Sequence, residues 1–504
     1  GQGITTVQVG GGLMKMEHAR VENCGRVALG EYCVRLHLVG ECEACVVRGI
    51  AVERAVNKAI TVHGTHGATV ERNVVYDVRG AGIYIEDGNE LRNTIAHNAI
   101  LCPSLSHKSQ IGRLTPAEPP TGRTATGHRC ALKGVPSHSD SDYDEQSGIY
   151  LLSPTNDVIG NHVVGMENAF YVNHQGGRSY GIGAAYGRVC ILSSPFGRVS
   201  GNVFHNNAGF GWYVNVAFTT AVAAAADSGF VDDWSTCLPF NMTSGADLAA
   251  PITVSNHVEY FNDFSMGAYD LGDVSFVDTV SAFNNKGLYW KSYRRGAAAG
   301  PLALRTTFHD NGMQIQGPGG SAAVELRGAT FSWSATDAAS QPIQLNHHCG
   351  LDLEPTGGLC ASHYDFADST FSVPPNFIDD TAAHRSDVVV LYNGTVRVLL
   401  TANRAFDGAG CTSEDPWLVC PAAMGLRIVR IYSPDRGTMV VTADGVGYEV
   451  AYRPVPKWSG HAKLPYVPGS AYIHPTGYTF VVKDGATVEI SLRTDLSQSA
   501  SERS

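Results

Sequence analysis

Long hydrophobic runs are absent from this sequence of 504 residues. A membrane-spanning helix needs about 18 or more apolar residues in succession, and the longest run of small apolar residues, 217–226, is too short and too rich in alanine. Charged residues are also few, at 16%. Disordered chains combine high charge with low hydrophobicity, so the 43% of hydrophobic residues argues against disorder. The sequence predicts a folded chain without a membrane span.

Basic residues are outnumbered, with 36 Lys and Arg against 47 Asp and Glu, and the formal net charge is −11. Proteins that bind nucleic acid neutralise phosphates with clustered Lys and Arg. We therefore exclude nucleic acid as a partner. The same charge opposes tight binding of a polyanionic sugar, unless a local basic strip or a bound cation intervenes.

Paired CxxC motifs with zinc spacing are missing from the 12 cysteines, because Cys42 and Cys45 form the only CxxC. Cys411 and Cys420 are expected to form a disulfide that closes one loop. Asn241 and Asn393 each begin an N-glycosylation sequon. Together these features favour an oxidising, extracellular or cell-surface setting and a disulfide-bonded glycoprotein.

Helix-period patterning is missing as well, whereas short strand patterns are abundant. Residues 58–98 read as strands of a few residues rich in Val, Ile and Tyr, separated by Gly, Asn and Asp. Similar blocks recur roughly every 22–28 residues, a period typical of solenoids. The 56 glycines fit such a turn-dense chain. We predict an all-β fold, a right-handed parallel β-helix.

The strand patterns divide the chain into two regions. Residues 1–384 are expected to form the β-helix, with a polar, proline-rich loop inserted at 103–147. Longer strands at 385–504, with hairpin-like turns at Asp444-Gly445 and Asp484-Gly485, predict a small antiparallel β-sandwich. Asparagines at the turns of the β-helix are expected to stack and to hydrogen-bond along it: Asn161, Asn202, Asn256, Asn284 and Asn311.

Period-2 parity places polar residues on the outer face of three early strands. In 34–38, Val34, Leu36 and Leu38 share one face and leave Arg35 and His37 on the other. The same parity faces His63 outward in 60–63, and Tyr84 and Glu86 in 83–86. Strands stacked about 4.8 Å apart would align these side chains as a ladder over three coils.

These segments also carry a family resemblance. GEYCVRLHLVG followed by VNKAITVHGTHGATVERNVVYDVRGAGIYIEDG resembles the β-helix of the cell-migration-inducing hyaluronidase, the transmembrane hyaluronidase and fibrocystin-like proteins. Later pieces, including SPTNDVIGNHVVGMENAFYVN and NVFHNNAGFGWYVN, follow in a similar order, so the resemblance covers roughly residues 1–375. It implies an extracellular or cell-surface location and, in some members, calcium-dependent hyaluronan depolymerisation. The relatives carry a G8 domain upstream of this helix, which is not seen in this sequence.

Two positions depart from the family pattern. Arg35 stands where the first strand typically has a histidine, and Ala81 stands where a histidine commonly precedes the LEDG-like motif. The positions that match the family are His63, His66, Glu86, Asp87 and Gly88.

The predicted ladder has the residue types that polysaccharide cleavage requires. His37, His63 and His66 are candidate bases, Tyr84 or Glu86 is the candidate acid, and Arg35 is a partner for a uronate carboxylate. Asp87 is a further candidate catalytic residue. The alternative is that these residues merely solvate the β-helix and shape its turns. Aromatic residues at strand ends are either sugar-stacking platforms or ordinary packing: Tyr171, Trp212, Tyr213, Tyr289 and Trp290. Asp140, Asp142 and Asp144 are oxygen ligands suited to calcium, or else a solvated acidic loop.

Two functions therefore stand side by side. The first is a non-catalytic, fibrocystin-like scaffold that packs with other extracellular or cell-surface proteins and binds polysaccharide at most passively; the replaced histidines, the negative charge and the lack of an evident carboxylate pair favour it. The second is an endo-acting polysaccharide depolymerase, a hydrolase or lyase with its site on the ladder of residues 35–87. Convergence of those side chains on an open groove would favour the enzyme.

Overall fold

The computed structural model describes the chain over these residues: 4–7, 12–26, 30–103, 147–152, 155–173, 189, 197–214, 252–271, 274–293, 302–318, 323–334, 342–347, 361–379, 387–400, 402–432, 437–451 and 477–494. Nearly every regular element in these ranges is a β-strand. No helix within them has the length and apolar character that a membrane crossing requires.

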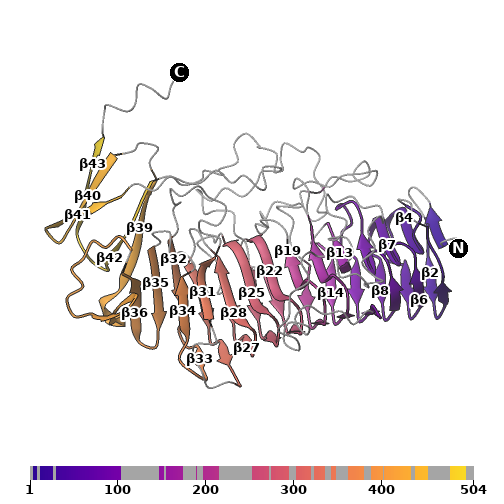
Figure 1. The fold of residues 1–504 in the computed structure, drawn as a ribbon. Helices are drawn as coiled ribbons and strands as arrows, with labels where there is room; N and C mark the ends of the chain where they lie inside the picture. Colours follow the sequence, from indigo (N-terminus) through magenta and orange to yellow (C-terminus); the bar gives the residue numbers. More distant parts are fainter. Residues whose placement is uncertain are drawn as a thin grey trace.

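Three long sheets, A, B and C, run side by side along the molecule, and each coil of the chain adds one strand to each sheet (Figure 1). Sheet A contains β1 (Ile4–Val7), β4 (Val34–Glu41), β7 (Ile60–His66), β10 (Ile83–Ile85), β13 (Ser147–Leu151), β16 (Asn168–Val172), β19 (Phe210–Val214), β22 (Phe264–Leu271), β25 (Lys286–Tyr293), β28 (Met313–Pro318), β31 (Pro342–His347) and β34 (Asn376–Asp379).

The parallel part of sheet B contains β2 (Lys15–Glu17), β5 (Val46–Arg48), β8 (Thr69–Glu71), β11 (Thr94–Ala96), β14 (Asp157–Ile159), β17 (Val199–Ser200), β20 (Ile252–Ser255), β23 (Val274–Val277), β26 (Ala303–Leu304), β29 (Ala323–Arg327), β32 (Ala361–Asp365) and β35 (Asp387–Tyr392). Sheet C contains β3 (Arg20–Glu22), β6 (Ala51–Ala55), β9 (Val74–Val78), β12 (Ala99–Leu101), β15 (His162–Val164), β18 (Val203–His205), β21 (Val258–Tyr260), β24 (Val280–Ala282), β27 (Thr307–His309), β30 (Thr330–Ser332) and β33 (Thr370–Phe371). The predicted parallel β-helix is confirmed.

The inward faces of the strands build one continuous core. Leu36, Val62, Ile85, Leu151 and Val172 lie in register on successive strands of sheet A and are fully buried. Each such side chain contributes roughly 1.5–3 kcal/mol when it leaves water. The core therefore fixes the register, because a slip of one residue would expose this whole column.

One inward position was predicted wrongly. Leu38 adopts a φ of 54°, and the pairing of β4 with β7 shifts register between His37 and Gly40. The bulge moves Leu38 out of the alternation, so that Val39 takes the place in the main core. Leucine rarely adopts this backbone conformation, which is why the pattern of residue types did not reveal it.

Ladders of asparagine side chains support the turns, as predicted. Asn161 Oδ1 accepts hydrogen bonds from the backbone N–H and the side-chain Nδ2 of Asn98, at 3.0 and 2.9 Å. Asn161 Nδ2 in turn donates to Asn202 Oδ1 at 3.0 Å. A second ladder joins Asn207, Asn262, Asn284 and Asn311.

His257, rather than the predicted Asn256, continues the first ladder. Asn256 is exposed with a φ of 55°, whereas His257 is fully buried and its Nε2 lies 3.2 Å from Asn202 Nδ2. Burial lowers the pKa of His257 to about 3. The ring is therefore neutral, and Nε2 accepts a hydrogen bond where an asparagine Oδ1 would.

Replacing His257 tests whether its imidazole takes the place of an asparagine side chain in the ladder. His257→Ala should reduce the free energy of unfolding by about 1–3 kcal/mol, because Asn202 Nδ2 loses a buried acceptor. His257→Asn should stay close to wild type, since it restores the amide ladder. Asn256→Gly should change stability by no more than about 0.5 kcal/mol. Urea unfolding of the three variants measures these differences, and equal losses for His257→Asn and His257→Ala would contradict the ladder role.

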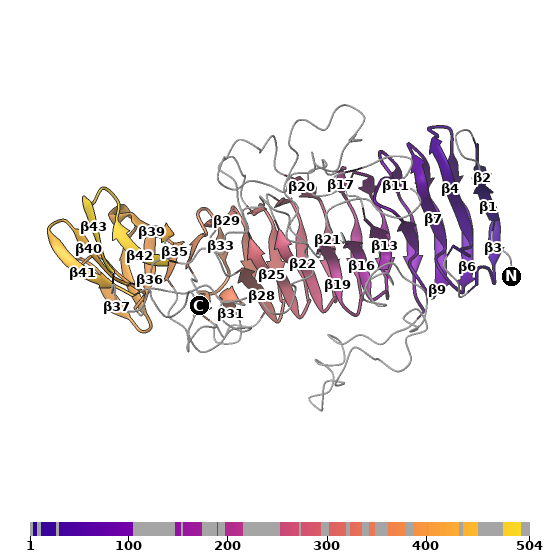
Figure 2. The same cartoon turned by 90° about the horizontal axis from the view of Figure 1, so that it is seen from above.

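Antiparallel strands follow the coils, at the far end of the molecule from β1 (Figure 2). They and one short 3₁₀ helix are β36 (Thr395–Leu399), β37 (Thr412–Glu414), β38 (Trp417–Pro421), η5 (Ala422–Met424), β39 (Leu426–Tyr432), β40 (Gly437–Ala443), β41 (Val446–Val450), β42 (Gly477–Lys483) and β43 (Val488–Thr494). The pair β39–β42 packs against the sheet β41–β40–β43 through a separate core that includes Met439, Val441, Tyr478 and Phe480. This is the expected small antiparallel sandwich.

The two predicted hairpin turns behave differently. Asp444 and Gly445, at φ 51° and 83°, join the antiparallel pair β40 and β41, and two successive positive φ values are typical of a type I′ hairpin. The Asp484-Gly485 turn instead leads from β42, which pairs with β39, to β43, which pairs with β40. That turn connects two sheets, so the hairpin predicted there is wrong.

Candidate functional site

The predicted polar ladder lies on the outer face of sheet A in its first coils. Thr61 of β7 is in register with Arg35 of β4 and with Tyr84 of β10. His63 of β7 is in register with His37 of β4. Strand parity therefore placed these side chains on one face, as the sequence indicated.

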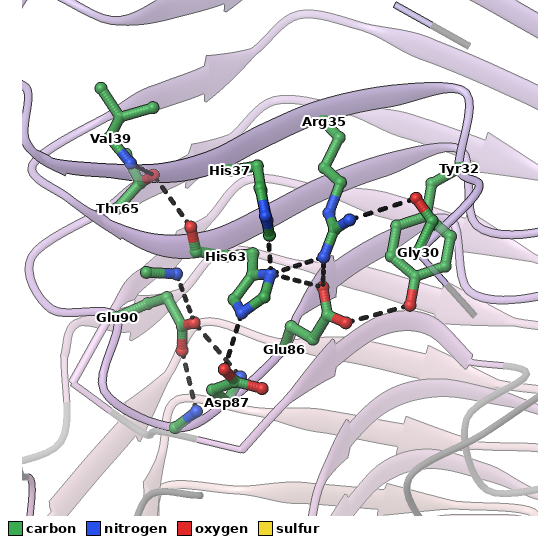
Figure 3. Close-up of polar contacts among 12 residues, drawn as sticks. Gly30, Tyr32, Arg35, His37, Val39, His63, Thr65, Glu86, Asp87 and Glu90 are labelled. Carbon is green, nitrogen blue, oxygen red and sulfur yellow. Dashed lines mark hydrogen bonds and ion pairs between the residues drawn. The ribbon is translucent and has the colours of Figure 1, made fainter. Parts of the chain in front are cut away.

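Three side chains converge on a single atom, His63 Nδ1 (Figure 3). Arg35 Nη2 lies 2.5 Å from it and His37 Nδ1 lies 2.8 Å from it. Glu86 Oε2 is 3.3 Å away. The other ring nitrogen, His63 Nε2, lies 2.6 Å from Asp87 Oδ2. Below, these five residues are called the His63 cluster.

The carboxylates of the cluster are engaged within the protein. Glu86 Oε2 accepts from Arg35 Nη2 at 3.2 Å, and Glu86 Oε1 accepts from the hydroxyl of Tyr32 at 3.0 Å. Arg35 Nη1 donates to the carbonyl of Gly30 at 3.1 Å. Buried ionised groups persist only when they are paired and hydrogen-bonded in this way.

Glu90 is a buried acid next to the cluster that sequence reasoning missed. Its Oε1 accepts the backbone N–H groups of Gly64 and Asp87, at 2.8 and 3.2 Å, and its Oε2 accepts that of Gly88 at 2.8 Å. Burial, and then the charge of Asp87, raise the pKa of Glu90 to about 7. Glu90 fixes the turn that presents Asp87, and no strand parity exists in a turn to indicate it.

Most of the cluster is shielded from solvent. The exposed fractions are 9% for Arg35, 3% for His63, 2% for Glu86 and 1% for Asp87. Only His37 is half-buried. The side chains thus converge at a buried point. His37 is the member of the cluster that connects this point to the surface.

Opposing influences act on the His63 imidazole. Burial alone lowers its pKa, but the hydrogen bond with Asp87 and the charges of Glu86, Asp87 and Glu90 outweigh burial and leave the pKa raised. Arg35 can only donate, so its contact at 2.5 Å requires a lone pair on Nδ1 and places the proton on Nε2, toward Asp87. Protonation of Nδ1 would transfer that contact from Arg35 to Glu86 Oε2.

His37 is held in its neutral form. Burial, followed by the positive charge of Arg35 and by the neighbouring imidazole of His63, lowers the pKa of His37 to about 4. An efficient general base has a pKa close to the working pH. His37 is therefore a weak base at neutral pH.

His66 and Tyr84, the other predicted catalytic residues, have different surroundings. His66 Nδ1 accepts the backbone N–H of Leu91 at 3.2 Å, and burial lowers the pKa of His66 to about 4. The Tyr84 ring stacks on Tyr150 at 5.0 Å and lies 4.8 Å from the ammonium of Lys58, which is also fully buried. Both positions brace the coil rather than present a group to solvent.

The aromatic residues suggested as sugar platforms are buried. Trp212 and Trp290 belong to the main core and are 0% exposed. Tyr171, Tyr213 and Tyr289 belong to an aromatic cluster of their own and are at most 9% exposed. Ordinary packing is their role in this structure.

Disulfides bracket the strand that carries Arg35 and His37. Cys24–Cys33 lies just before β4, and Cys42–Cys45 lies just after it. Cys411 and Cys420 form a third disulfide. The first closes the connection that leads into β4, and the second closes the turn that leaves it.

The remaining predicted sites fall partly outside the described residues. Asp140, Asp142, Asp144 and Asn241 lie there, so calcium binding and glycosylation at these positions stay predictions. Asn393 is exposed at the turn between β35 and β36. Within the described ranges, no three His, Cys, Asp or Glu side chains gather as a metal site.

The fold and the site together define the class of protein. It is a parallel β-helix whose first coils carry a buried cluster of acidic and basic side chains. Residues 3–212 match the family model described as CEMIP beta-helix, so the resemblance predicted from the sequence is confirmed over these residues.

Curated relatives match about two fifths of the chain. Human Fibrocystin-L is 27% identical over 206 residues, which are 40% of this chain and 4% of that protein. Human cell surface hyaluronidase CEMIP2 is 25% identical over 224 residues, which are 42% of this chain and 16% of that protein. Human cell migration-inducing and hyaluronan-binding protein is 24% identical over 221 residues. The match thus spans only a small part of each relative's length.

Proposed function

We propose that this chain is a non-catalytic β-helix scaffold of the extracellular space or cell surface, fibrocystin-like, that packs with other proteins of that setting. One observation carries the proposal: the carboxylates of the His63 cluster are at most 2% exposed and are bound to partners inside the protein. An acid that cleaves a glycosidic bond must reach the leaving oxygen. In this arrangement the cluster acts as an internal brace between coils.

The location is supported by two features. Three disulfides occur among the described residues, and such bonds persist in oxidising compartments. One relative is named a cell surface hyaluronidase. Polysaccharide binding without cleavage fits the same role, since another relative is named a hyaluronan-binding protein.

A second candidate function is an endo-acting polysaccharide depolymerase. The observation that favours it is the chain of contacts from the half-buried His37 through His63 to Asp87, at 2.8 and 2.6 Å. A surface imidazole oriented by a buried imidazole and a carboxylate resembles an acid–base relay. The low pKa of His37 and the burial of the acids weigh against it.

A depolymerisation assay separates the two functions. The purified chain, with added calcium, would be incubated with hyaluronan, other uronate polymers and neutral glycans, and chain length would be followed by size-exclusion chromatography. We expect no shortening of any polymer, because no acid of the cluster is accessible.

The matched control is the double variant His63→Ala/Glu86→Ala. Shortening by the wild-type chain that disappears in this variant would replace the scaffold proposal with the depolymerase. A parallel measurement of retention on immobilised hyaluronan tests passive binding, which does not require the His63 cluster.

A further inference from the structure

A second pair of histidines lies on the outer face of sheet C, away from the His63 cluster. His162 begins β15 and His205 ends β18, and the two strands are neighbours with His162 opposite Val203 and Val164 opposite His205. The histidines are therefore diagonal neighbours. Their Nε2 atoms face each other at 2.7 Å.

The orientation of His205 is fixed by the residue that follows it. His205 Nδ1 lies 2.7 Å from Asn206 Oδ1, and an amide oxygen only accepts. Nδ1 therefore carries the hydrogen and Nε2 carries the lone pair. The contact between the two rings is then one hydrogen bond, donated by His162 Nε2 to His205 Nε2.

The surroundings leave this pair open on one side. The His205 ring stacks on Tyr260 with centroids 4.4 Å apart and an interplanar angle of 8°, which holds the ring in place. His162 is exposed and His205 is half-buried. A small ion can reach the space between the two Nε2 atoms directly from solvent.

We propose that His162 and His205 form a binding site for a divalent transition-metal ion that prefers imidazole, such as Zn²⁺ or Cu²⁺. Imidazole nitrogens bind these ions at about 2.0–2.1 Å, so a small outward rotation of the rings admits the ion. The hydrogen bond of His205 Nδ1 to Asn206 is the support that metal-binding histidines usually have.

The proton balance of this binding is simple. His205 already presents the Nε2 lone pair, and His162 shifts its hydrogen from Nε2 to Nδ1 through solvent, with no change of charge. Both Nε2 lone pairs then bind the ion. Within the described residues no further His, Cys, Asp or Glu completes a set of three, so the other coordination positions are left to water. Mg²⁺ and Ca²⁺, which prefer oxygen ligands, are not expected there.

Calorimetric titration of the full chain with Zn²⁺, and separately with Cu²⁺, tests the proposal. Wild type should bind one more equivalent than either His162→Ala or His205→Ala, and Cu²⁺ bound there should show nitrogen coupling by electron paramagnetic resonance. His309→Ala is the control, because His309 lies on the same face of sheet C but outside the pair; it should keep that equivalent.

Asn206 provides a sharper comparison. Its φ of 57° suits glycine, so Asn206→Gly should keep the fold but weaken metal binding by about tenfold, the lower end of the usual effect for a supporting residue. Asn206→Asp retains the acceptor and should bind at least as tightly as wild type. Equal binding by wild type, His162→Ala and His205→Ala would overturn the proposal, as would unchanged coupling in both alanine variants.

Discussion

Glu86→Ala should reduce the free energy of unfolding by about 3–5 kcal/mol, the usual loss when one partner of a buried ion pair is removed. The variant leaves the guanidinium of Arg35 without its carboxylate, and it removes the acceptor of the Tyr32 hydroxyl. Both groups are at most 9% exposed, so water cannot replace the lost contacts. The unfolding midpoint in urea, with an unchanged slope, measures the loss.

Two comparisons make this result specific. Glu22→Ala removes contacts of the same kind with Arg20 and Arg54 at the surface, where the Glu22 side chain is 42% exposed, and should change stability by less than about 1 kcal/mol. Arg35→Met/Glu86→Leu removes both charges and should recover much of the loss. A Glu86→Ala loss no larger than that of Glu22→Ala would show that the His63 cluster does not brace the coils.

Glu259 should make the stability of the β-helix depend on pH. It lies fully buried on β21, in register between Phe204 and Ser281, and its Oε2 accepts from Ser265 Oγ at 2.8 Å. Gly211 makes room for this carboxyl group, because a Cβ there would collide with Oε2. Burial raises the pKa of Glu259 from its ordinary 4.5 to about 8.

The sign of the effect follows from this raised pKa. The folded chain holds a proton that the unfolded chain has lost, so the contribution of Glu259 is fully present below pH 4.5 and is lost as pH rises through about 8. Between about pH 5 and about pH 9 the wild-type chain should lose roughly 4 kcal/mol more than Glu259→Gln. Urea unfolding across this range measures the difference, and parallel curves for the two proteins would contradict it. His257 titrates in both proteins, so its contribution to the pH dependence of stability cancels in the comparison.

The sequence was most informative where strand parity and burial agree. Ile83 and Ile85 face the core and Tyr84 faces away because side chains alternate along a strand. The same rule placed Arg35 and His63 on one face, where they are in contact. Local alternation and stacking of coils were sufficient for this part of the site.

The features that the sequence did not predict share a different cause. They depend on backbone geometry and strand pairing, which the pattern of residue types does not determine. The bulge at Leu38 and the step from β42 to another sheet at Asp484-Gly485 depend on tertiary pairing. His257 was missed because an asparagine, the expected ladder residue, directly precedes it. Glu90 was missed because it acts on backbone N–H groups of a turn.

Burial of the site was also beyond the sequence. Outward parity predicts a polar face, but whether solvent reaches that face depends on what packs over it. The 2% exposure of Glu86 is therefore a property of the assembled coils. This value is the reason that we propose a scaffold rather than an enzyme.

The way sheet B ends has a consequence for self-association. Strand β35 is parallel to β32 on one edge and antiparallel to β36 on the other, and the sheet then ends at the three-residue strand β37, whose residues are all exposed. An open edge of parallel strands would offer a template on which a second molecule could add coil upon coil, as in fibre growth. The reversal of strand direction at β36 and the short polar edge beyond it interrupt that template, so growth of a filament from this end of sheet B is disfavoured.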